Sequence, residues 1–334
     1  MKPAFAIPLD TAPMEAKAQD ALPGDVGQWQ YERKWDGFRC LAFKAENVVE
    51  LRAKSGKPLG RYFPEIVSML RELAAKEFVV DGEIVIEIEA LFSFDALQMR
   101  LHPAASRIQK LSIATPAKLI LFDMLANSEA SLINQPFAAR RAALESFVEA
   151  ADLDDLELSR STQDLTIAMK WLSESGQGST DGVIAKLLAD EYRPGERAMI
   201  KVKRLRTADC VVGGFRYLEK TREVGSLLLG LYNDQGQLDH VGFTSTIARD
   251  DRPELTQKLE ALRASPGFTG KAPGAPSRWS TERSGQWEPL RPELVAEVRF
   301  DHVTGDRFRH GTKFMRWRLD KKPEQCTFEQ ITEQ

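Results

Sequence analysis

Two different patterns of apolar residues divide this sequence, and they constrain its fold more than any other feature. From Trp29 to Lys203, extended apolar runs alternate with amphipathic segments of helical period, which predicts a mixed α+β domain. After Arg206 the pattern changes to short strands separated by turn residues, which is typical of a small β-barrel. We therefore expect two domains, 1–205 and 206–334, and the length of 334 residues is sufficient for both.

The expected elements follow from the period of each segment. In the first domain we expect strands at Trp29–Arg33, Phe38–Phe43, Val48–Leu51, Phe78–Ile88, Leu119–Leu125 and Gly182–Leu187, and helices at Phe63–Lys76, Phe137–Ala150 and Asp164–Ser175. In the second we expect strands at Ala208–Tyr217, Ser226–Tyr232, His240–Thr244 and Ala296–Val303, and one helix at Pro253–Ala264. Residues 1–28 are expected to be irregular, and the Pro- and Gly-rich stretch Ser265–Trp287 to be a long surface loop.

Composition narrows the class of protein. With 43% hydrophobic and 28% charged residues the chain is expected to fold, and a net charge of −3 means that any nucleic-acid surface must come from local basic clusters. No apolar run reaches the roughly 20 residues of a membrane span, and the start resembles no secretion signal, so we expect a cytoplasmic protein. Three scattered cysteines, Cys40, Cys210 and Cys326, predict reduced structural thiols rather than disulfides or zinc.

The first candidate for chemistry is Lys34, in Lys34-Trp35-Asp36-Gly37 at the end of an expected strand. Four residues alone are weak evidence, and a solvated lysine in a surface turn is an equally simple interpretation. A second candidate is Glu83, in the apolar strand that holds Asp81-Gly82-Glu83. Either Asp81-Gly82 forms a hairpin turn, or Glu83 faces a cleft and binds a metal ion or a ribose hydroxyl.

Lysines on two later strands are further candidates. Lys186 ends the apolar run 181–186, and Lys201 and Lys203 lie two positions apart, which places them on one face of a strand. They could form a solvated face or bind phosphate. Near the carboxy terminus, residues 306–322 hold eight Lys, Arg or His against two Asp, interleaved with aromatic residues. This run could be a solvated edge strand and tail, or the local basic patch that the net charge requires.

Taken in order, these motifs resemble those of the covalent nucleotidyltransferases, which include ATP-dependent DNA ligases, RNA ligases and mRNA capping enzymes. The matching stretches are Lys34–Gly37, Asp81–Glu83, Leu121–Asp123, Asp181–Lys186 and Lys201–Lys203. The similarity covers nearly the whole chain and favours the small stand-alone bacterial ATP-dependent DNA ligases of the C type, together with the ligase module of bacterial end-joining ligases. It implies an adenylation domain followed by an oligonucleotide/oligosaccharide-binding (OB) domain.

The resemblance also implies roles for single residues. Lys34 would attack the α-phosphate of ATP to form lysyl-AMP, and Glu83 and Asp181 would bind Mg²⁺. The other nucleotide contacts would come from Glu32 at the adenine edge, Phe122 and Ile184 on its two faces, Arg39 and Glu83 at the ribose, and Lys54, Lys186, Lys201, Lys203, Arg316, Arg318 and Lys321 at the phosphates. Two positions depart from the family pattern, because Asp181 replaces a Glu and Lys54 replaces an Arg, which has a bidentate fork that lysine lacks.

A DNA ligase of this kind would act on nicked double-stranded DNA in repair, as a monomer, in the bacterial cytoplasm at the nucleoid. Its partners could include a Ku-like protein or a repair polymerase. Two alternatives share the motifs: an RNA ligase or capping-type guanylyltransferase, and an inactive nucleic-acid-binding relative. Covalent labelling by ATP or by GTP separates the enzymes, and no labelling at all would indicate the inactive relative.

Overall fold

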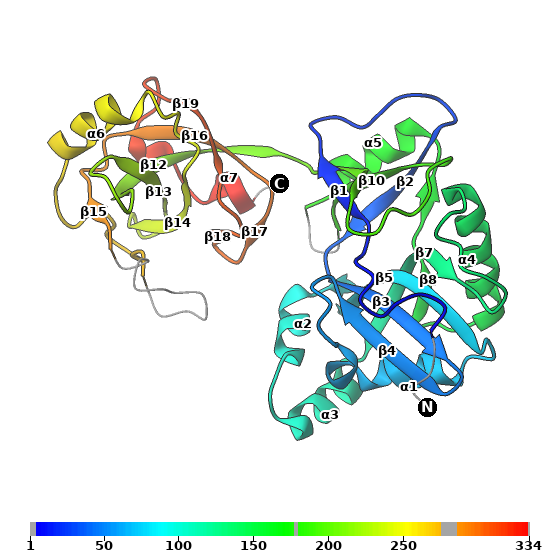
Figure 1. The fold of residues 1–334 in the computed structure, drawn as a ribbon. Coiled ribbons are helices and arrows are strands. Elements are labelled where there is room, and N and C mark those ends of the chain that lie inside the picture. Colours follow the sequence, from blue (N-terminus) through cyan, green and yellow to red (C-terminus); the bar gives the residue numbers. More distant parts are fainter. Residues whose placement is uncertain (1–4, 177–179, 275–285, 333–334) are drawn as a thin grey trace. The chain divides into compact units, whose positions relative to one another are not determined.

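The computed structural model describes residues 5–176, 180–274 and 286–332, and the chain divides into two compact units, Met1–Arg204 and Leu205–Gln334 (Figure 1). Each unit is described by itself. None of the helices in the described parts of the chain is both long and apolar enough to cross a membrane.

Unit Met1–Arg204 contains two sheets. The larger has the strand order β4-β3-β5-β7-β8, with β6 on β5, and the smaller has the order β1-β11-β10-β2-β9 (Figure 1). The larger sheet consists of β3 (Phe38–Ala45), β4 (Val48–Ala53), β5 (Glu77–Ile88), β6 (Leu91–Phe92), β7 (Ala117–Ala126) and β8 (Leu156–Leu158). The smaller sheet consists of β1 (Glu15–Ala18), β2 (Trp29–Trp35), β9 (Ser161–Thr162), β10 (Thr180–Leu187) and β11 (Arg197–Val202).

Helices cover the outer faces of both sheets. One face of the larger sheet packs against the helices that follow its strands, through Ile66, Leu97 and Leu144. The smaller sheet packs against a single helix through Tyr31, Val183 and Ala168. These helices are α1 (Pro64–Glu72), preceded by η1 (Gly60–Tyr62), α2 (Phe94–Arg100), α4 (Phe137–Ala151) and, on the smaller sheet, α5 (Leu165–Glu174). Helix α3 (Ala105–Ala114) contacts α1.

The inner faces of the two sheets share a third apolar cluster. Leu41 and Val79 come from the larger sheet, Met199 comes from the smaller one, and Tyr192 comes from the β10–β11 loop. Because side chains alternate along a strand, the sequence neighbours of Leu41 and Val79 belong instead to the outer cluster of the larger sheet. The residues that face this shared interior are therefore fixed by strand phase, and the candidate site lies among them.

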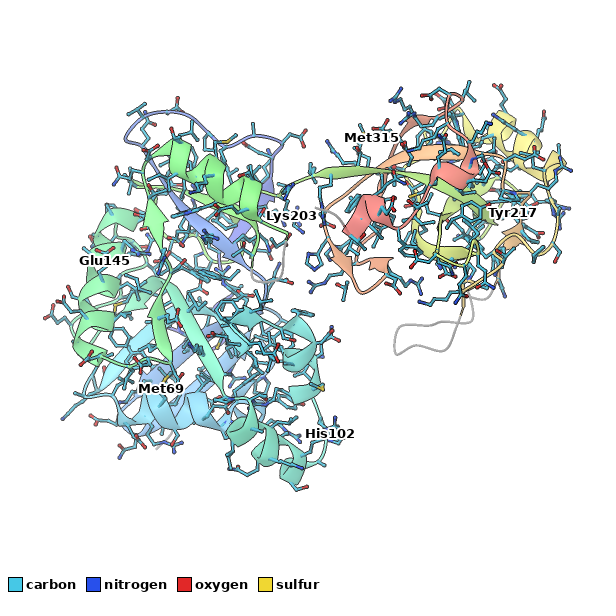
Figure 2. All side chains as sticks on the ribbon, turned by 180° about the vertical axis from the view of Figure 1, so that it is seen from behind. Met69, His102, Glu145, Lys203, Tyr217 and Met315 are labelled. Atoms are coloured by element: carbon cyan, nitrogen blue, oxygen red, sulfur yellow. The ribbon has the colours of Figure 1, made fainter. Side chains whose placement is uncertain are left out.

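Unit Leu205–Gln334 is built on one sheet with the order β14-β13-β12-β16-β19, with β15 on β12. Its elements are β12 (Arg206–Tyr217), β13 (Val224–Tyr232), β14 (Leu238–Thr244), α6 (Arg252–Ala261), β15 (Glu288–Pro289), β16 (Val295–Phe300), the β17–β18 pair (Val303–Thr304, Arg307–Phe308), β19 (Lys313–Trp317), η3 (Pro323–Gln325) and α7 (Glu329–Thr332). Met315 is exposed on β19 (Figure 2).

The mixed α and β architecture is confirmed, but the closed barrel is not. Among the described residues the two edge strands, β14 and β19, share no hydrogen-bonded ladder, and one isolated bridge joins Thr244 to Thr312 beside them. The sheet is therefore open, with its edges linked at a single point.

Several boundaries differ from expectation. The irregular start contains β1, which pairs in parallel with β11, and the pattern of Glu15–Ala18 is too polar to indicate a strand. The proposed Asp81-Gly82 hairpin is wrong, because both residues lie inside the continuous strand β5. In the expected surface loop Ser265–Trp287, Phe268 is buried against Trp287 and His240, while residues 275–285 lie outside the described residues. The three cysteines are buried and unpaired.

Candidate active site

A cavity of about 250 Å³ opens in unit Met1–Arg204, at the edge of its shared apolar interior. Its wall brings together most of the candidate residues from the sequence, although they come from segments up to 169 residues apart along the chain, from Glu32 to Lys201. The lining residues are Pro13, Met14, Glu15, Ala16, Glu32, Arg33, Lys34, Trp35, Arg39, Lys54, Glu83, Phe122, Ile184, Lys186, Met199 and Lys201.

Strand phase explains the orientation of the candidate residues on β2 and β10. On β2, Tyr31 packs against α5, so the alternating positions Glu32 and Lys34 face the opposite side. On β10, Val183 and Ala185 pack against α5, and Ile184 and Lys186 face the cavity. The two strands are paired with Ile184 opposite Glu32, so this small sheet presents two amines, a carboxylate and an apolar side chain on one face.

The nucleophile candidate Lys34 lies in an ion-paired cluster rather than in a surface turn. Its Nζ is 2.8 Å from Oδ2 of Asp181, and Nζ of Lys203 is 2.9 Å from the same oxygen. Burial opposes ionisation of Asp181, but the two ammonium groups outweigh it and lower the pKa of this carboxyl below its ordinary value. Lys203, labelled in Figure 2, follows β11 directly. Asp181 therefore stays ionised and pairs with two cations. Of these three residues Lys34 lines the cavity, whereas Asp181 and Lys203 are not among the lining residues.

Lys201 and Lys54 supply further positive charge at the same cavity. Burial, together with the ammonium groups of Lys34 and Lys203, lowers the pKa of Lys201. No carboxylate forms a salt bridge with Lys201 in the described part of the chain, so its ammonium can take an anionic ligand. Lys54 is more exposed and lies 3.1 Å from Oε1 of Glu15.

Glu83 lies on β5 and accepts a hydrogen bond from the backbone N–H of Gly37 at 3.2 Å. Burial raises the pKa of Glu83 to about 7, against the opposing effects of Arg39 and Lys34. Glycine is required at position 37, where the backbone passes close to β5, because a Cβ there would collide with the carbonyl oxygen of Ile84 and the side chain of Glu83. The Lys-x-Asp-Gly motif thus has a packing reason for its glycine.

Arg39 is held by Asp81, a contact that the sequence did not indicate. Its Nε and Nη2 each donate to one carboxylate oxygen of Asp81 at 2.6 Å, and Asp81 is completely buried. The guanidinium lies 4.4 Å from the ring centroid of Phe122, and Nη2 also donates to the Met14 carbonyl at 3.2 Å. Asp81 belongs to the motif Asp81-Gly82-Glu83. It is buried, and its carboxylate binds Arg39.

Glu32 and Lys186 form a buried pair at another part of the wall. Lys186 Nζ donates to both Glu32 oxygens, at 3.1 and 3.0 Å, and to the Phe122 carbonyl at 2.8 Å. Burial lowers the pKa of Lys186, although Glu32 opposes that shift. The sequence led us to expect Lys186 at a phosphate. The structure instead places its ammonium beside Glu32 and Phe122, the two residues that were expected to contact adenine.

The apolar part of the wall includes Phe122 and Ile184, the two expected base contacts, and two methionines, Met14 and Met199. Phe122, Met14 and Met199 are buried. Methionine fills irregular gaps well, and it adapts to flat ligands. Nothing in the type or spacing of Met199 marked it in the sequence, and only its position on β11 brings it to the cavity.

The three basic candidates of unit Leu205–Gln334 are described separately from this cavity. Arg318 Nη1 lies 2.9 Å from both oxygens of Asp209, and Lys321 Nζ lies 2.8 Å from one of them. Arg316 Nε donates to Glu297 at 2.6 Å. The basic run is therefore tied to carboxylates of its own unit.

The donors present fit a magnesium nucleotide better than a resident metal. Among the described residues no group of three or more His, Cys, Asp or Glu side chains could hold a metal ion. Glu83 nevertheless offers a hard oxygen ligand on the lysine-rich wall, and Asp181 offers another beside the lining residue Lys34. Mg²⁺ typically binds one or two protein carboxylates together with substrate phosphates and water, which suits this donor set.

Two family models match the chain. The model described as "ATP dependent DNA ligase domain" matches residues 13–203, and the model described as "ATP dependent DNA ligase C terminal region" matches residues 220–321. The first match spans every residue of the cavity wall. The second spans Arg316, Arg318 and Lys321.

Individual proteins agree with these models. DNA ligase C1 of Mycolicibacterium smegmatis is 43% identical over 329 residues, which cover 96% of this chain and 93% of that protein. The multifunctional non-homologous end joining protein LigD of the same organism is 28% identical over 97% of this chain, which corresponds to 40% of LigD. A solved structure of mycobacterial DNA ligase D complexed with ATP and MES is 27% identical, with a TM-score of 0.53, and the match covers 96% of this chain and 98% of that one.

Proposed function

The chain belongs to the family of ATP-dependent DNA ligases, and from this premise we propose that its cavity binds ATP with the α-phosphate at Lys34. The enzyme seals nicks between a 5′-phosphate and a 3′-hydroxyl in DNA through a lysyl-AMP intermediate. The matches to DNA ligase models over both units favour this activity over RNA ligation or capping. The observation that supports Lys34 as the nucleophile is its position at the cavity, beside Asp181 and Lys203.

In the first reaction the neutral amine of Lys34 forms a bond to the α-phosphorus. The bond from that phosphorus to the bridging oxygen breaks, its electron pair leaves with pyrophosphate, and the amine proton passes to solvent. Lys201 and Lys203 would stabilise negative charge on the phosphates, because preorganised cations do this most effectively in a partly desolvated site. AMP then passes to the 5′-phosphate of the nick, and the 3′-hydroxyl attacks that phosphate and releases AMP.

The wall of the cavity suggests how ATP would lie. Phe122 and Ile184 would hold the base, Glu32 its polar edge, and Arg39 and Glu83 the ribose. Lys186, bonded to Glu32, would support the base end rather than a phosphate. Lys54 and Lys201 would extend the positive wall toward the triphosphate.

Mg²⁺ would be held by Asp181 and Glu83 together with the phosphates. When bound, it supplies charge neutralisation on the triphosphate and so assists departure of pyrophosphate. The ion pair between Asp181 and Lys34 keeps this carboxylate at the cavity.

The two units would have different functions. Residues 1–205 would form the adenylation domain, and residues 206–334 would form an OB-type domain that carries Arg316, Arg318 and Lys321 for pyrophosphate. The relative named for non-homologous end joining supports a role in DNA repair, with a Ku-like protein or a repair polymerase as partner. We further infer that the protein acts on nicked double-stranded DNA as a monomer, at the nucleoid in the bacterial cytoplasm.

A labelling assay tests this function. The protein is incubated with α-labelled ATP or GTP and Mg²⁺, and the covalent adduct is then presented with nicked DNA or nicked RNA. We expect an acid-labile adduct from ATP that disappears when nicked DNA is sealed. Labelling by GTP alone, or transfer to RNA alone, would contradict the proposal, and no labelling at all would support the inactive relative.

A further inference from the structure

Tyr192 lies in the loop between β10 and β11 and is 2% exposed, yet it contributes no surface to the nucleotide cavity. Its loop is fastened by Arg140, whose Nη1 donates to the Asp190 carbonyl at 3.0 Å and whose guanidinium lies 5.6 Å from the Tyr192 ring centroid. A buried phenol needs partners for its hydroxyl. Those partners are groups that shape the cavity.

The hydroxyl of Tyr192 makes two hydrogen bonds. It donates to Oδ2 of Asp81 at 2.6 Å and accepts from the backbone N–H of Met14 at 2.9 Å. Burial, together with the Asp81 carboxylate, raises the pKa of Tyr192 well above its ordinary value, so the hydroxyl keeps its proton and remains the donor. Met14 is part of the cavity wall, and Asp81 lies behind that wall, bonded to the lining residue Arg39.

Asp81 connects the hydroxyl to Arg39. The same oxygen, Oδ2, accepts from Tyr192 and from Nη2 of Arg39, each at 2.6 Å, while Oδ1 accepts from Nε of Arg39. Because Asp81 is fully buried, its orientation is set by these donors and not by water. The phenol therefore fixes the carboxylate that aims the guanidinium of Arg39 across Phe122.

Met14 is the second connection. The segment around Met14 forms a rim of the cavity, and hydrogen bonds join it to the β10–β11 loop. Glu15 N donates to the Glu196 carbonyl at 2.7 Å, and Met14 N donates to the Tyr192 hydroxyl at 2.9 Å. The Met14 carbonyl in turn accepts from Arg39 at 3.2 Å. One hydroxyl thus fixes the rim and the arginine relative to each other.

We propose that Tyr192 is a positioning residue for ATP binding in the adenylation reaction, acting through Asp81 on Arg39 and through Met14 on the rim. The proposal rests on the proposed function of the cavity. Removing the hydroxyl leaves the ring in the core but leaves the Met14 N–H and one Asp81 lone pair without their partner. Leaving buried polar groups without hydrogen bonds costs free energy, so the Met14 segment and the Asp81 carboxylate would rearrange. The orientation of the Arg39 guanidinium would then no longer be fixed.

The test is Tyr192→Phe, with Tyr31→Phe as the matched control. Tyr31 is also 2% exposed, donates to the Pro23 carbonyl at 2.6 Å, and packs toward α5 rather than the cavity. Lysyl-AMP formation is measured against ATP concentration for both variants and the unmodified enzyme. We expect Tyr192→Phe to raise the half-saturating ATP concentration roughly tenfold with a smaller change in maximal rate. Tyr31→Phe should leave the half-saturating concentration unchanged.

A second measurement asks whether Tyr192 acts through Arg39. In an Arg39→Lys background, which removes the fork, Tyr192→Phe should add little further loss, because the two changes remove one shared arrangement. The ATP-dependent rise in unfolding temperature should also be smaller in Tyr192→Phe than in Tyr31→Phe. An unchanged half-saturating ATP concentration, or a full additional loss in the Arg39→Lys background, would overturn the positioning role. Absence of lysyl-AMP in the unmodified enzyme would overturn the proposed function instead.

Discussion

Lys34 and Lys203 share one carboxylate oxygen, Oδ2 of Asp181, at 2.8 and 2.9 Å. The two lysines lie 169 positions apart in sequence: Lys34 is on β2, and Lys203 directly follows β11. In this arrangement Asp181 does two things: it offsets the charge of a crowded basic site, and it keeps the amine of Lys34 at the cavity. The carboxylate must therefore matter both to the rate of adenylation and to its dependence on pH.

Asp181→Asn should slow lysyl-AMP formation roughly 100-fold at saturating ATP, because a preorganised charge is lost from the reacting site. Removing a negative charge next to Lys34 also favours its neutral amine, so the pH profile of adenylation should move to lower pH. Rates measured across pH check both effects. Asp190→Asn, which touches only the pair with the half-exposed Arg193, is the control and should change neither.

Glu83→Gln should change how stability depends on pH. Because the pKa of Glu83 is raised to about 7 in the fold, the folded state holds a proton between about pH 4.5 and 7 that the unfolded state has released. Ionising Glu83 therefore weakens the ATP-free fold as pH rises through this window. Relative to the unmodified protein, the free energy of unfolding of Glu83→Gln should increase from pH 5 to 7, and the difference should then stay constant. A constant difference between the two proteins would contradict the shift.

Ionisation of Glu83 should have the opposite effect on the binding of Mg²⁺·ATP, which it should strengthen. If Mg²⁺·ATP takes the ionised carboxylate of Glu83, its apparent affinity should rise as pH passes about 7. Glu83→Gln should lose this dependence along with much of the affinity. Titration of adenylation with Mg²⁺ at pH 6, 7 and 8 measures it, and an equal dependence in both proteins would show that Glu83 is not involved.

Gly182→Ala should disrupt the site through the backbone. Gly182 has φ 135°, and a Cβ there would collide with the Val202 carbonyl where β10 and β11 meet. We expect a loss of about 2 kcal/mol or more in the free energy of unfolding, together with slower adenylation, since Asp181 and Lys203 flank the contact. Gly24→Ala, where a Cβ would make only an ordinary 3.6 Å contact with Leu165, is the control. Equal stability of the two variants would contradict this account.

Periodicity predicted the elements that are apolar on one face and missed those that are not. The expected strand Phe78–Ile88 and helix Phe137–Ala150 agree with β5 and α4 to within one residue. By contrast β1 and β8 were missed, because short edge strands need few apolar residues. Residues 94–100 and 105–114 form α2 and α3, whose periodicity was too weak to separate from loop.

Motif order predicted which residues meet, but not what each one touches. Lys34, Glu83 and Lys201 all line one cavity, as the resemblance implied. Lys186 was expected at a phosphate and is bonded to Glu32, because β10 pairs with β2 so that Ile184 lies opposite Glu32 and Lys186, two positions further on, shares the same face. The role that we propose for Tyr192 could not have been predicted from the sequence, because Tyr192 lies in a loop without periodicity. Its hydrogen-bond partners, Asp81 and Met14, are far from it in sequence and meet it only in the fold.

The central claim is that Lys34 carries the adenylate, and Lys34→Ala tests it most directly. The variant and a control, Lys170→Ala on the exposed side of α5, are assayed for covalent AMP from labelled ATP and for sealing of a nick that is already adenylated. Because Lys34 acts as nucleophile only in forming the enzyme adenylate, we predict that Lys34→Ala loses all covalent AMP but keeps substantial sealing of the pre-adenylated nick, while the control keeps both. Covalent AMP on the Lys34→Ala protein would contradict the account.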